Sequence, residues 1–165
     1  ATANLGGAGD AYLFLNTQTF GTINQAASVE RVDLHYQLAD QDSAGIESAQ
    51  MTTVNGFTVG HDSVIYNGAV ADGTNFTDAG SFSSLATLDA GLNNALDPTH
   101  KYVFALYTGA EDINHNGVAD DHNAGVLAWD NDGTGITSVL VLPGVTTLAA
   151  HDLSFPTPPP VTQPA

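Results

Sequence analysis

The sequence predicts a mostly β fold: a single antiparallel β-sandwich, Ig-like or jelly-roll-like, with one short helix near residues 83–96. Three observations lead to this prediction. Residues 32–38 alternate apolar and polar side chains with a period of two, as in a half-buried strand. Asn-Gly pairs at residues 55–56 and 67–68 separate apolar segments and are typical of type I′ hairpin turns. Aspartate outnumbers glutamate, and aspartate prefers turns to helices.

Further strands are predicted where short apolar runs are bounded by turn residues. In chain order these runs are Ala11–Leu15, Lys101–Thr108, Gly125–Trp129, Ile136–Leu142 and Thr146–Phe155. No internal repeat is evident.

The one predicted helix covers the segment from Ser83 to Leu96. Leucines recur there at helical spacing, and Asp97-Pro98 is expected to end the helix. Gly91 in its interior disfavours the helix by about 1 kcal/mol relative to alanine.

The length fits one domain, predicted over residues 11–155. A flexible segment, residues 1–10, is expected before it. A Pro-rich extended tail, residues 156–165, is expected after it, because consecutive prolines favour the polyproline conformation.

Composition excludes several classes of function. The chain contains two basic and eighteen acidic residues, which gives a formal net charge of −16. Binding of nucleic acid or of anionic membranes through a basic patch is therefore not expected. A saline habitat is an alternative source of this acidity.

Without cysteine there is no disulfide, thiolate zinc site or thiol nucleophile. No apolar run is long enough for membrane insertion. The start at Ala1 rather than methionine favours a processed, secreted protein at the cell surface.

The clearest chemistry lies between Asp112 and Asp121, where oxygen-bearing side chains occupy alternate positions and Gly117 permits a sharp turn. Calcium takes about six to eight oxygen ligands and is often wrapped by one such loop. The predicted ligands are Asp112, Asn114, Asn116, Val118 (through its backbone carbonyl), Asp120 and Asp121.

This stretch resembles the DxDxDG calcium loops of EF-hands, dockerins and thrombospondin type 3 repeats, over residues 112–123 only. The resemblance implies Ca²⁺ as the cofactor and implies no fold for the rest of the chain. The sequence departs from the pattern at Asn123, which stands in place of a bidentate acidic ligand, so Asp121 or an acid from another loop is expected to complete the shell. Asn114 and Asn116 in place of aspartate also lower the ligand charge, so a weak, extracellular type of site is expected. The alternative interpretation is a metal-free turn rich in Asp and Asn.

Other clusters are predicted to be structural. Asp130 and Asp132 before Gly133 favour a hairpin turn over a second metal site, and the acids near Gly45 favour a solvated loop. The six histidines are scattered, and no catalytic motif occurs. No catalytic residues are therefore predicted, and the protein is not expected to be an enzyme.

These features predict an extracellular, calcium-stabilised structural or adhesive module, a pilus-like filament subunit whose partners are copies of itself. Subunits would join by strand addition, with Ala11–Leu15 or the tail docking on a neighbour's sheet edge. The alternative is a calcium-braced carbohydrate-binding module that binds glycans. The aromatic residues considered for stacking on sugars are Trp129, Tyr66, Tyr102 and Tyr107, although the setting of Trp129 favours the core.

Overall fold

The computed structural model describes residues 2–6, 9–15, 21–26, 29–36, 45–46, 50–119 and 121–153. Strands dominate and one short α-helix is present, so the prediction of a mostly β fold is confirmed. The elements are β1 (Thr2–Leu5), β2 (Gly9–Leu15), β3 (Gly21–Gln25), β4 (Val29–Tyr36), β5 (Gln50–Asn55), β6 (Ser63–Tyr66), β7 (Phe76–Phe82), α1 (Leu85–Ala95), β8 (Tyr102–Tyr107), β9 (Ala124–Trp129), β10 (Ser138–Pro143) and the 3₁₀ turn η1 (Ala150–Asp152). No helix in these ranges is both long and apolar enough to span a membrane.

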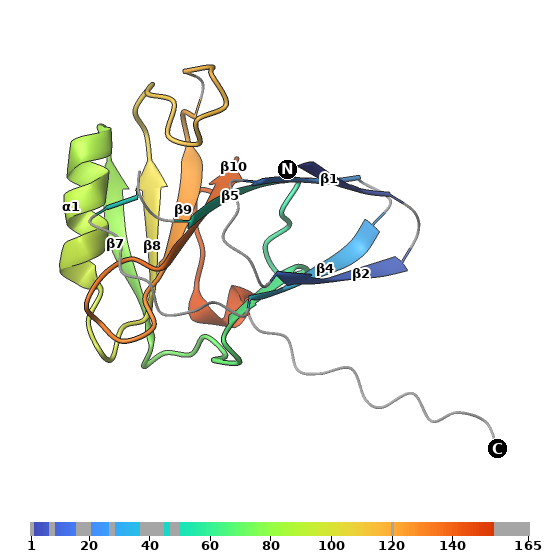
Figure 1. The fold of residues 1–165 in the computed structure, drawn as a ribbon, viewed down its shortest axis with the longest axis horizontal. Helices are drawn as coiled ribbons and strands as arrows, with labels where there is room; N and C mark the ends of the chain where they lie inside the picture. The colour runs from blue at the N-terminus through green and yellow to red at the C-terminus, as the bar shows by residue number, and fades with distance from the viewer. Residues whose placement is uncertain are drawn as a thin grey trace.

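The strands form two sheets, and most of their pairs are parallel (Figure 1). The larger sheet has seven strands in the order β1-β3-β5-β10-β9-β8-β7, and the smaller has the order β2-β4-β6. Among these strand pairs only β8–β9 and β9–β10 are antiparallel. The predicted antiparallel sandwich is therefore wrong in strand direction. Alternation identifies the two faces of a strand but carries no information about its partner.

The first six strands wind as a coil between the two sheets. Strands β1, β3 and β5 lie side by side in the larger sheet, while β2, β4 and β6 alternate with them along the chain and lie in the smaller sheet. We call each successive pair (β1–β2, β3–β4 and β5–β6) a rung. Residues 1–10, expected to be flexible, include β1 and the start of β2.

The rungs stack in register, so that like residues become neighbours. The neighbours across β1, β3 and β5 are Thr2, Thr22 and Thr53, and likewise Asn4, Asn24 and Asn55. Asn55 Nδ2 donates to Asn24 Oδ1 and Asn24 Nδ2 donates to Asn4 Oδ1, both at 2.8 Å. We call this chain of amides the asparagine ladder. It marks a repeated Thr-x-Asn motif that the sequence analysis missed, because its copies are unevenly spaced.

The larger sheet has an apolar core on each face. One core lies toward the smaller sheet and includes Ile23, Leu34 and Val54. The other lies toward α1, where Leu88 and Leu92 are fully buried, as the leucine spacing predicts. Helix α1 contacts β7 and β8 and lies far from β1 (Figure 1).

The two Asn-Gly pairs have different roles. Asn67 and Gly68 both have positive φ (47° and 73°), and Ala69 N donates to Tyr66 O at 2.8 Å, so the predicted tight turn is present there. The hairpin predicted at residues 55–56 is wrong, because β5 and β6 belong to different sheets. Gly56 has φ of 86°, and a Cβ there would lie 2.9 Å from the Gln25 carbonyl oxygen. Glycine is needed here for close stacking of one rung on the next.

The segments predicted as strands near residues 101–108, 125–129 and 136–142 are confirmed as β8, β9 and β10. The strand predicted at 146–155 is wrong, since the described part of that segment contains η1 and no strand. Leu148 and Leu153 are buried in the core between the sheets, and Leu153 O accepts a hydrogen bond from Val64 N at 3.1 Å. The predicted tail lies outside the described residues.

Candidate metal centre

The predicted calcium ligands lie in the loop between β8 and β9, which rises from one end of the larger sheet (Figure 1). Tyr107 and Ala124 are directly paired in the antiparallel ladder. The sheet therefore holds the two ends of the loop side by side, independently of the conformation of the loop.

Left-handed backbone conformations make the turns of this loop. Gly117, predicted to permit the sharp turn, has φ of 88°, and His115 has φ of 55°. Asn123, which replaces the acidic ligand of related loops, has φ of 58°. Asparagine tolerates this region better than most residues, so its presence at this position has a conformational reason.

Side-chain oxygens of the loop accept hydrogen bonds from its own backbone. Asp112 Oδ1 accepts from the Asn116 amide at 3.0 Å, and Asp112 Oδ2 accepts from the Gly117 amide at 2.8 Å. Asn114 Oδ1 accepts from the same Asn116 amide at 3.0 Å. Asn116 Oδ1 accepts from the Val118 amide at 2.7 Å. The carboxylate of Asp112 and the amide oxygen of Asn114 thus converge on one nitrogen.

Asp121 is buried at the base of the loop, where its carboxylate accepts hydrogen bonds from residues near the start of the loop. Its Oδ2 accepts from the amides of Ile113 and Asn114 at 2.7 and 3.0 Å, and its Oδ1 accepts from Asn114 Nδ2 at 2.7 Å. Ile113 itself is buried in the core under α1. Two of these three hydrogen bonds come from Asn114, so Asp121 holds Asn114 in place through both its backbone and its side chain.

These residues fit a hard cation in part. Carboxylate and amide oxygens are the ligand types that calcium prefers, and those of Asp112 and Asn114 lie on the same side of the turn. Val118 has no ligand atom on its side chain, so its backbone carbonyl is the group that it could offer. Asp120 lies outside the described residues. Within the described ranges no group of three or more His, Asp or Glu residues is arranged to hold a metal. The candidate centre therefore depends on amide and backbone oxygens in addition to the Asp112 carboxylate.

A second contact ties the start of the loop to α1. Glu111 Oε2 accepts from the first helical amide, Leu85 N, at 2.5 Å and from the Tyr107 hydroxyl at 3.0 Å. A carboxylate at a helix N-terminus is favourable because the amides there lack partners within the helix. Burial, followed by the neighbouring Glu111 carboxylate, raises the pKa of Tyr107, so this hydroxyl remains a donor.

A hollow of about 320 Å³ separates the loop from the stacked threonines of the larger sheet. Its lining residues are Thr2, Gly21, Thr22, Met51, Thr53, Asn55, Asn114, His115 and Asn116. The lining contains hydroxyl and amide groups, the His115 ring and the Met51 side chain, and it contains no carboxylate. It suits a neutral hydrogen-bonding ligand better than a metal ion.

The acidic cluster at Asp130 forms a hairpin turn, as the sequence favours. Asp130 is buried, and its two oxygens accept from the amides of Asp132, Gly133 and Gly135 at 2.8–3.0 Å. The turn joins the antiparallel strands β9 and β10. The other acids considered, Asp40, Asp42 and Glu47, lie outside the described residues.

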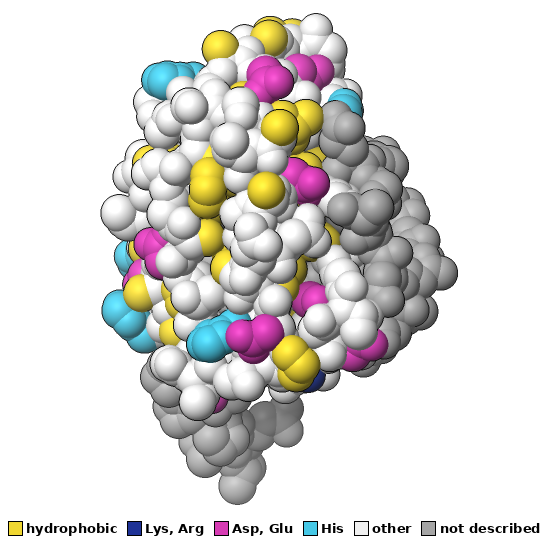
Figure 2. Space-filling view, turned by 90° about the vertical axis from the view of Figure 1, so that its left-hand side faces the viewer, with side chains coloured by type: hydrophobic (Ala, Val, Ile, Leu, Met, Phe, Trp, Pro, Cys, Tyr) yellow, Lys and Arg dark blue, Asp and Glu magenta, His cyan; other side chains and the backbone are white. Residues whose placement is uncertain are grey.

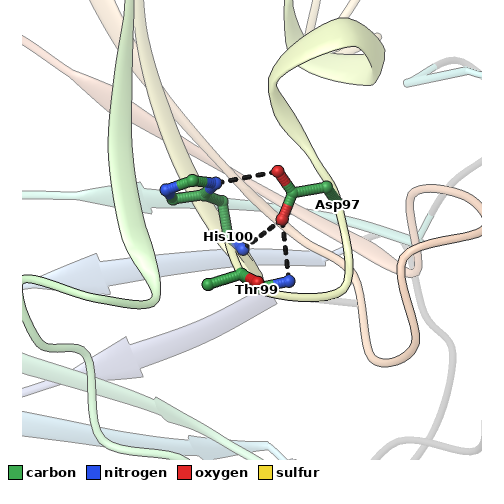
Figure 3. A network of polar contacts seen from close by, with 3 residues as sticks. All are labelled: Asp97, Thr99 and His100. Atoms are coloured by element: carbon green, nitrogen blue, oxygen red, sulfur yellow. Dashed lines mark hydrogen bonds and ion pairs between the residues drawn. The ribbon is translucent and has the colours of Figure 1, made fainter.

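A polar turn follows α1 (Figure 3). Asp97 Oδ1 accepts from the amides of Thr99 and His100, both at 2.7 Å, and Asp97 Oδ2 lies 2.9 Å from His100 Nδ1. The His100 ring and these amides lower the pKa of Asp97 from 3.8 to about 2. This pair fixes the connection from α1 to β8.

The aromatic residues considered for sugar stacking are all buried. Trp129 stacks on Tyr66 with ring centroids 5.3 Å apart and planes 8° apart, and it meets Tyr102 edge-on at 4.7 Å. The core position favoured for Trp129 is confirmed. Tyr107 is likewise fully buried, so none of these rings is presented to a glycan.

Acidic side chains and histidines are scattered over the side of the molecule that carries α1 (Figure 2). They form no single cluster on that face that would compete with the β8–β9 loop as a cation site. No protein-family model matches the chain, and no curated protein or solved structure is significantly similar to it.

Proposed function

We propose that this chain is an extracellular structural module that is stabilised by calcium in the β8–β9 loop and assembles by strand addition. The observation that supports calcium most directly is the convergence of Asp112 Oδ1 and Asn114 Oδ1 on the Asn116 amide. Both oxygens lie 3.0 Å from the same nitrogen and are therefore close to each other, as two ligands of one cation must be.

Three side chains and one carbonyl supply the proposed ligands. Asp112, Asn114 and Asn116 provide side-chain oxygens, and Val118 provides its carbonyl. Bound Ca²⁺ supplies positive charge to a loop in a chain of net charge −16. Asp121 acts through Asn114, because its hydrogen bonds to the backbone and side chain of Asn114 hold that ligand in position.

Calorimetry on chelator-stripped protein tests the site. The wild type is expected to bind calcium at millimolar or lower concentration, and Asp112→Ala is expected to bind it at least about tenfold more weakly, because a charged ligand is lost. Asp72→Ala is the matched control, since Asp72 also accepts backbone amides in an exposed loop, from Thr74 and Asn75. Absence of binding heat in the wild type would reject the calcium site.

Assembly by strand addition needs an unpaired sheet edge. The predicted donor, Ala11–Leu15, lies in β2, where it pairs with β4 of its own chain. Donation of this strand to a neighbour would therefore require exchange of an existing pair. Negative-stain electron microscopy in calcium, and again after chelation, tests assembly: fibres that fray on chelation are expected, and isolated particles in both conditions would reject the filament.

Carbohydrate binding is the second candidate, and the hollow beside the loop supports it. Thr22, Thr53 and Asn55 line this hollow with neutral hydroxyl and amide groups, which can hydrogen-bond sugar hydroxyls without a stacking ring. A glycan array probed with the wild type and with Thr22→Val tests this function. Hits that the variant loses would support it, and an array without hits would reject it.

A further inference from the structure

The coil formed by β1 to β6 ends in two strands with an open edge. In the described part of the chain, β1 pairs only with β3 and β2 pairs only with β4, so both lie at the ends of their sheets. They belong to the same rung. Among the described strands, none lies beside the outward backbone groups of β1 and β2 at this end.

The asparagine ladder points toward this open end. Each amide group donates toward the preceding rung, from Asn55 to Asn24 and from Asn24 to Asn4. Asn4 accepts at Oδ1 and is exposed. The next acceptor in the same series would be an asparagine oxygen one rung farther out. Ladders of identical amide side chains are a known source of stability between stacked strands.

The apolar side of the coil is also incomplete at this end. Val54 in β5 is fully buried and Ile23 in β3 is 3% exposed, whereas Ala3 in β1 is only half-buried. Leu5 is likewise half-buried and packs against the same core. A further rung would cover Ala3 and Leu5 as β3 is covered by β1.

The two edges of the larger sheet differ in protection. At the far edge, β7 carries the charged Asp78, a shift in register after Asp78 and a glycine with positive φ at residue 80. Such features discourage edge pairing. β1 has the sequence Thr-Ala-Asn-Leu, which contains no charge and no proline, and its pairing with β3 is regular. The β1 edge therefore lacks the features that prevent strand addition. In β2 a charge and a shift in register occur at Asp10, near its start, and Ala11–Leu15 pairs regularly with β4.

We propose that this end binds a parallel β rung of another stacked-strand polypeptide. The partner rung carries Asn in register with Asn4 and small or apolar residues in register with Ala3 and Leu5. The basis is continuity with an interface already present, since β1–β3 and β3–β5 repeat one geometry. This inference goes beyond the proposed function, because it requires neither calcium nor a second copy of the chain.

A covalently supplied rung tests the proposal in the full chain. A copy of residues 1–20 is fused directly before Ala1, so that the added threonine and asparagine precede Thr2 and Asn4 by the same offset that separates Thr2 from Thr22. The copied rung is expected to stack on β1 and β2, to raise Tm and to slow hydrogen exchange of the β1 amides several-fold. Exchange at unchanged rates would overturn the proposal.

Two control fusions separate stacking from mere chain extension. In the first, the copied residues corresponding to Ala3 and Leu5 become lysine; in the second, the copied Asn4 becomes alanine. The first is expected to abolish the protection of β1 and the second to reduce it. Equal protection of the β1 amides in all three fusions would overturn the proposed register of the added rung on Ala3, Asn4 and Leu5. Sedimentation of the parent chain without calcium completes the test: an antiparallel dimer through β1 would overturn parallel addition. Loss of calcium binding or of fibres would leave these results unchanged.

Discussion

Aspartate side chains in this protein commonly bind the backbone amides that follow them. Asp72, Asp97, Asp112 and Asp130 each accept at least two such bonds. The short side chain can reach amides two to five residues later, whereas the longer glutamate reaches them with a greater loss of conformational entropy. This local role explains the excess of aspartate over glutamate. In the β8–β9 loop, the same kind of hydrogen bond fixes the position of the Asp112 oxygens.

The Asp97–His100 pair makes folding stability depend on pH (Figure 3). The pKa of folded Asp97 is about 2, below its ordinary 3.8, chiefly because of the His100 side chain. A carboxyl group whose pKa is lowered by folding stabilises the folded state at pH values above its ordinary pKa. This contribution is lost as the pH falls through the pKa of the folded state. Asp97→Asn is therefore expected to weaken the dependence of Tm on pH between about 4 and 2.

Carboxyl NMR titration measures the same effect at its source. His100→Gln removes the first cause of the shift, so the pKa of Asp97 is expected to rise toward its ordinary value. An unchanged Asp97 pKa in this variant would assign the shift to the backbone amides alone.

Secondary-structure elements differ in how far the sequence predicts them. Helix α1 and strands β8 to β10 follow from leucine spacing and apolar runs, and the β9–β10 turn follows from Asp130 and Gly133. The pairing of β1 to β6 does not, because each strand joins one that is two elements away in the sequence. The Thr-x-Asn motifs at residues 2–4, 22–24 and 53–55 contain that information, but only as an irregularly spaced repeat.

The candidate site shows the same division between local and long-range information. The loop, its turn at Gly117 and its inward oxygens follow from local spacing. The burial of Asp121 and the contact between Glu111 and the start of α1 do not, since both depend on how the loop packs on the sheet and helix. Distant contacts of this kind have no sequence pattern of their own.

The packing of α1 on β7 explains the glycine inside the helix. A Cβ on Gly91 would overlap the ring of Phe82. Alanine is ordinarily favoured over glycine in a helix by about 1 kcal/mol. Overpacking typically costs about 1–3 kcal/mol. Gly91→Ala is therefore expected to lower the free energy of unfolding in urea.

The Phe82→Ala background provides the control for this prediction. With the ring removed, the same Gly91→Ala change is expected to stabilise the protein, by up to about 1 kcal/mol. A stabilising effect of Gly91→Ala in the wild-type background would show that Phe82 moves aside at little cost.

The molecule as a whole carries a formal charge of −16 on 165 residues. Charge of one sign opposes compaction, and Figure 2 shows acidic side chains spread over the face that carries α1. A structural module with this charge can be stabilised by cations in two ways. Diffuse ions screen all of the acids, whereas a bound ion acts at one loop.

Thermal unfolding separates the two contributions. Sodium chloride is expected to raise Tm gradually and equally in the wild type and in Asp112→Ala, because screening reaches all exposed charges. Calcium at matched ionic strength is expected to raise the wild-type Tm further. At ten times Kd the gain is about 1.4 kcal/mol, or about 3–6 °C for a domain of this size. Asp112→Ala is expected to lose that additional shift while keeping the response to salt. If calcium shifts both proteins equally, it acts as a screening ion and the β8–β9 loop is a metal-free turn.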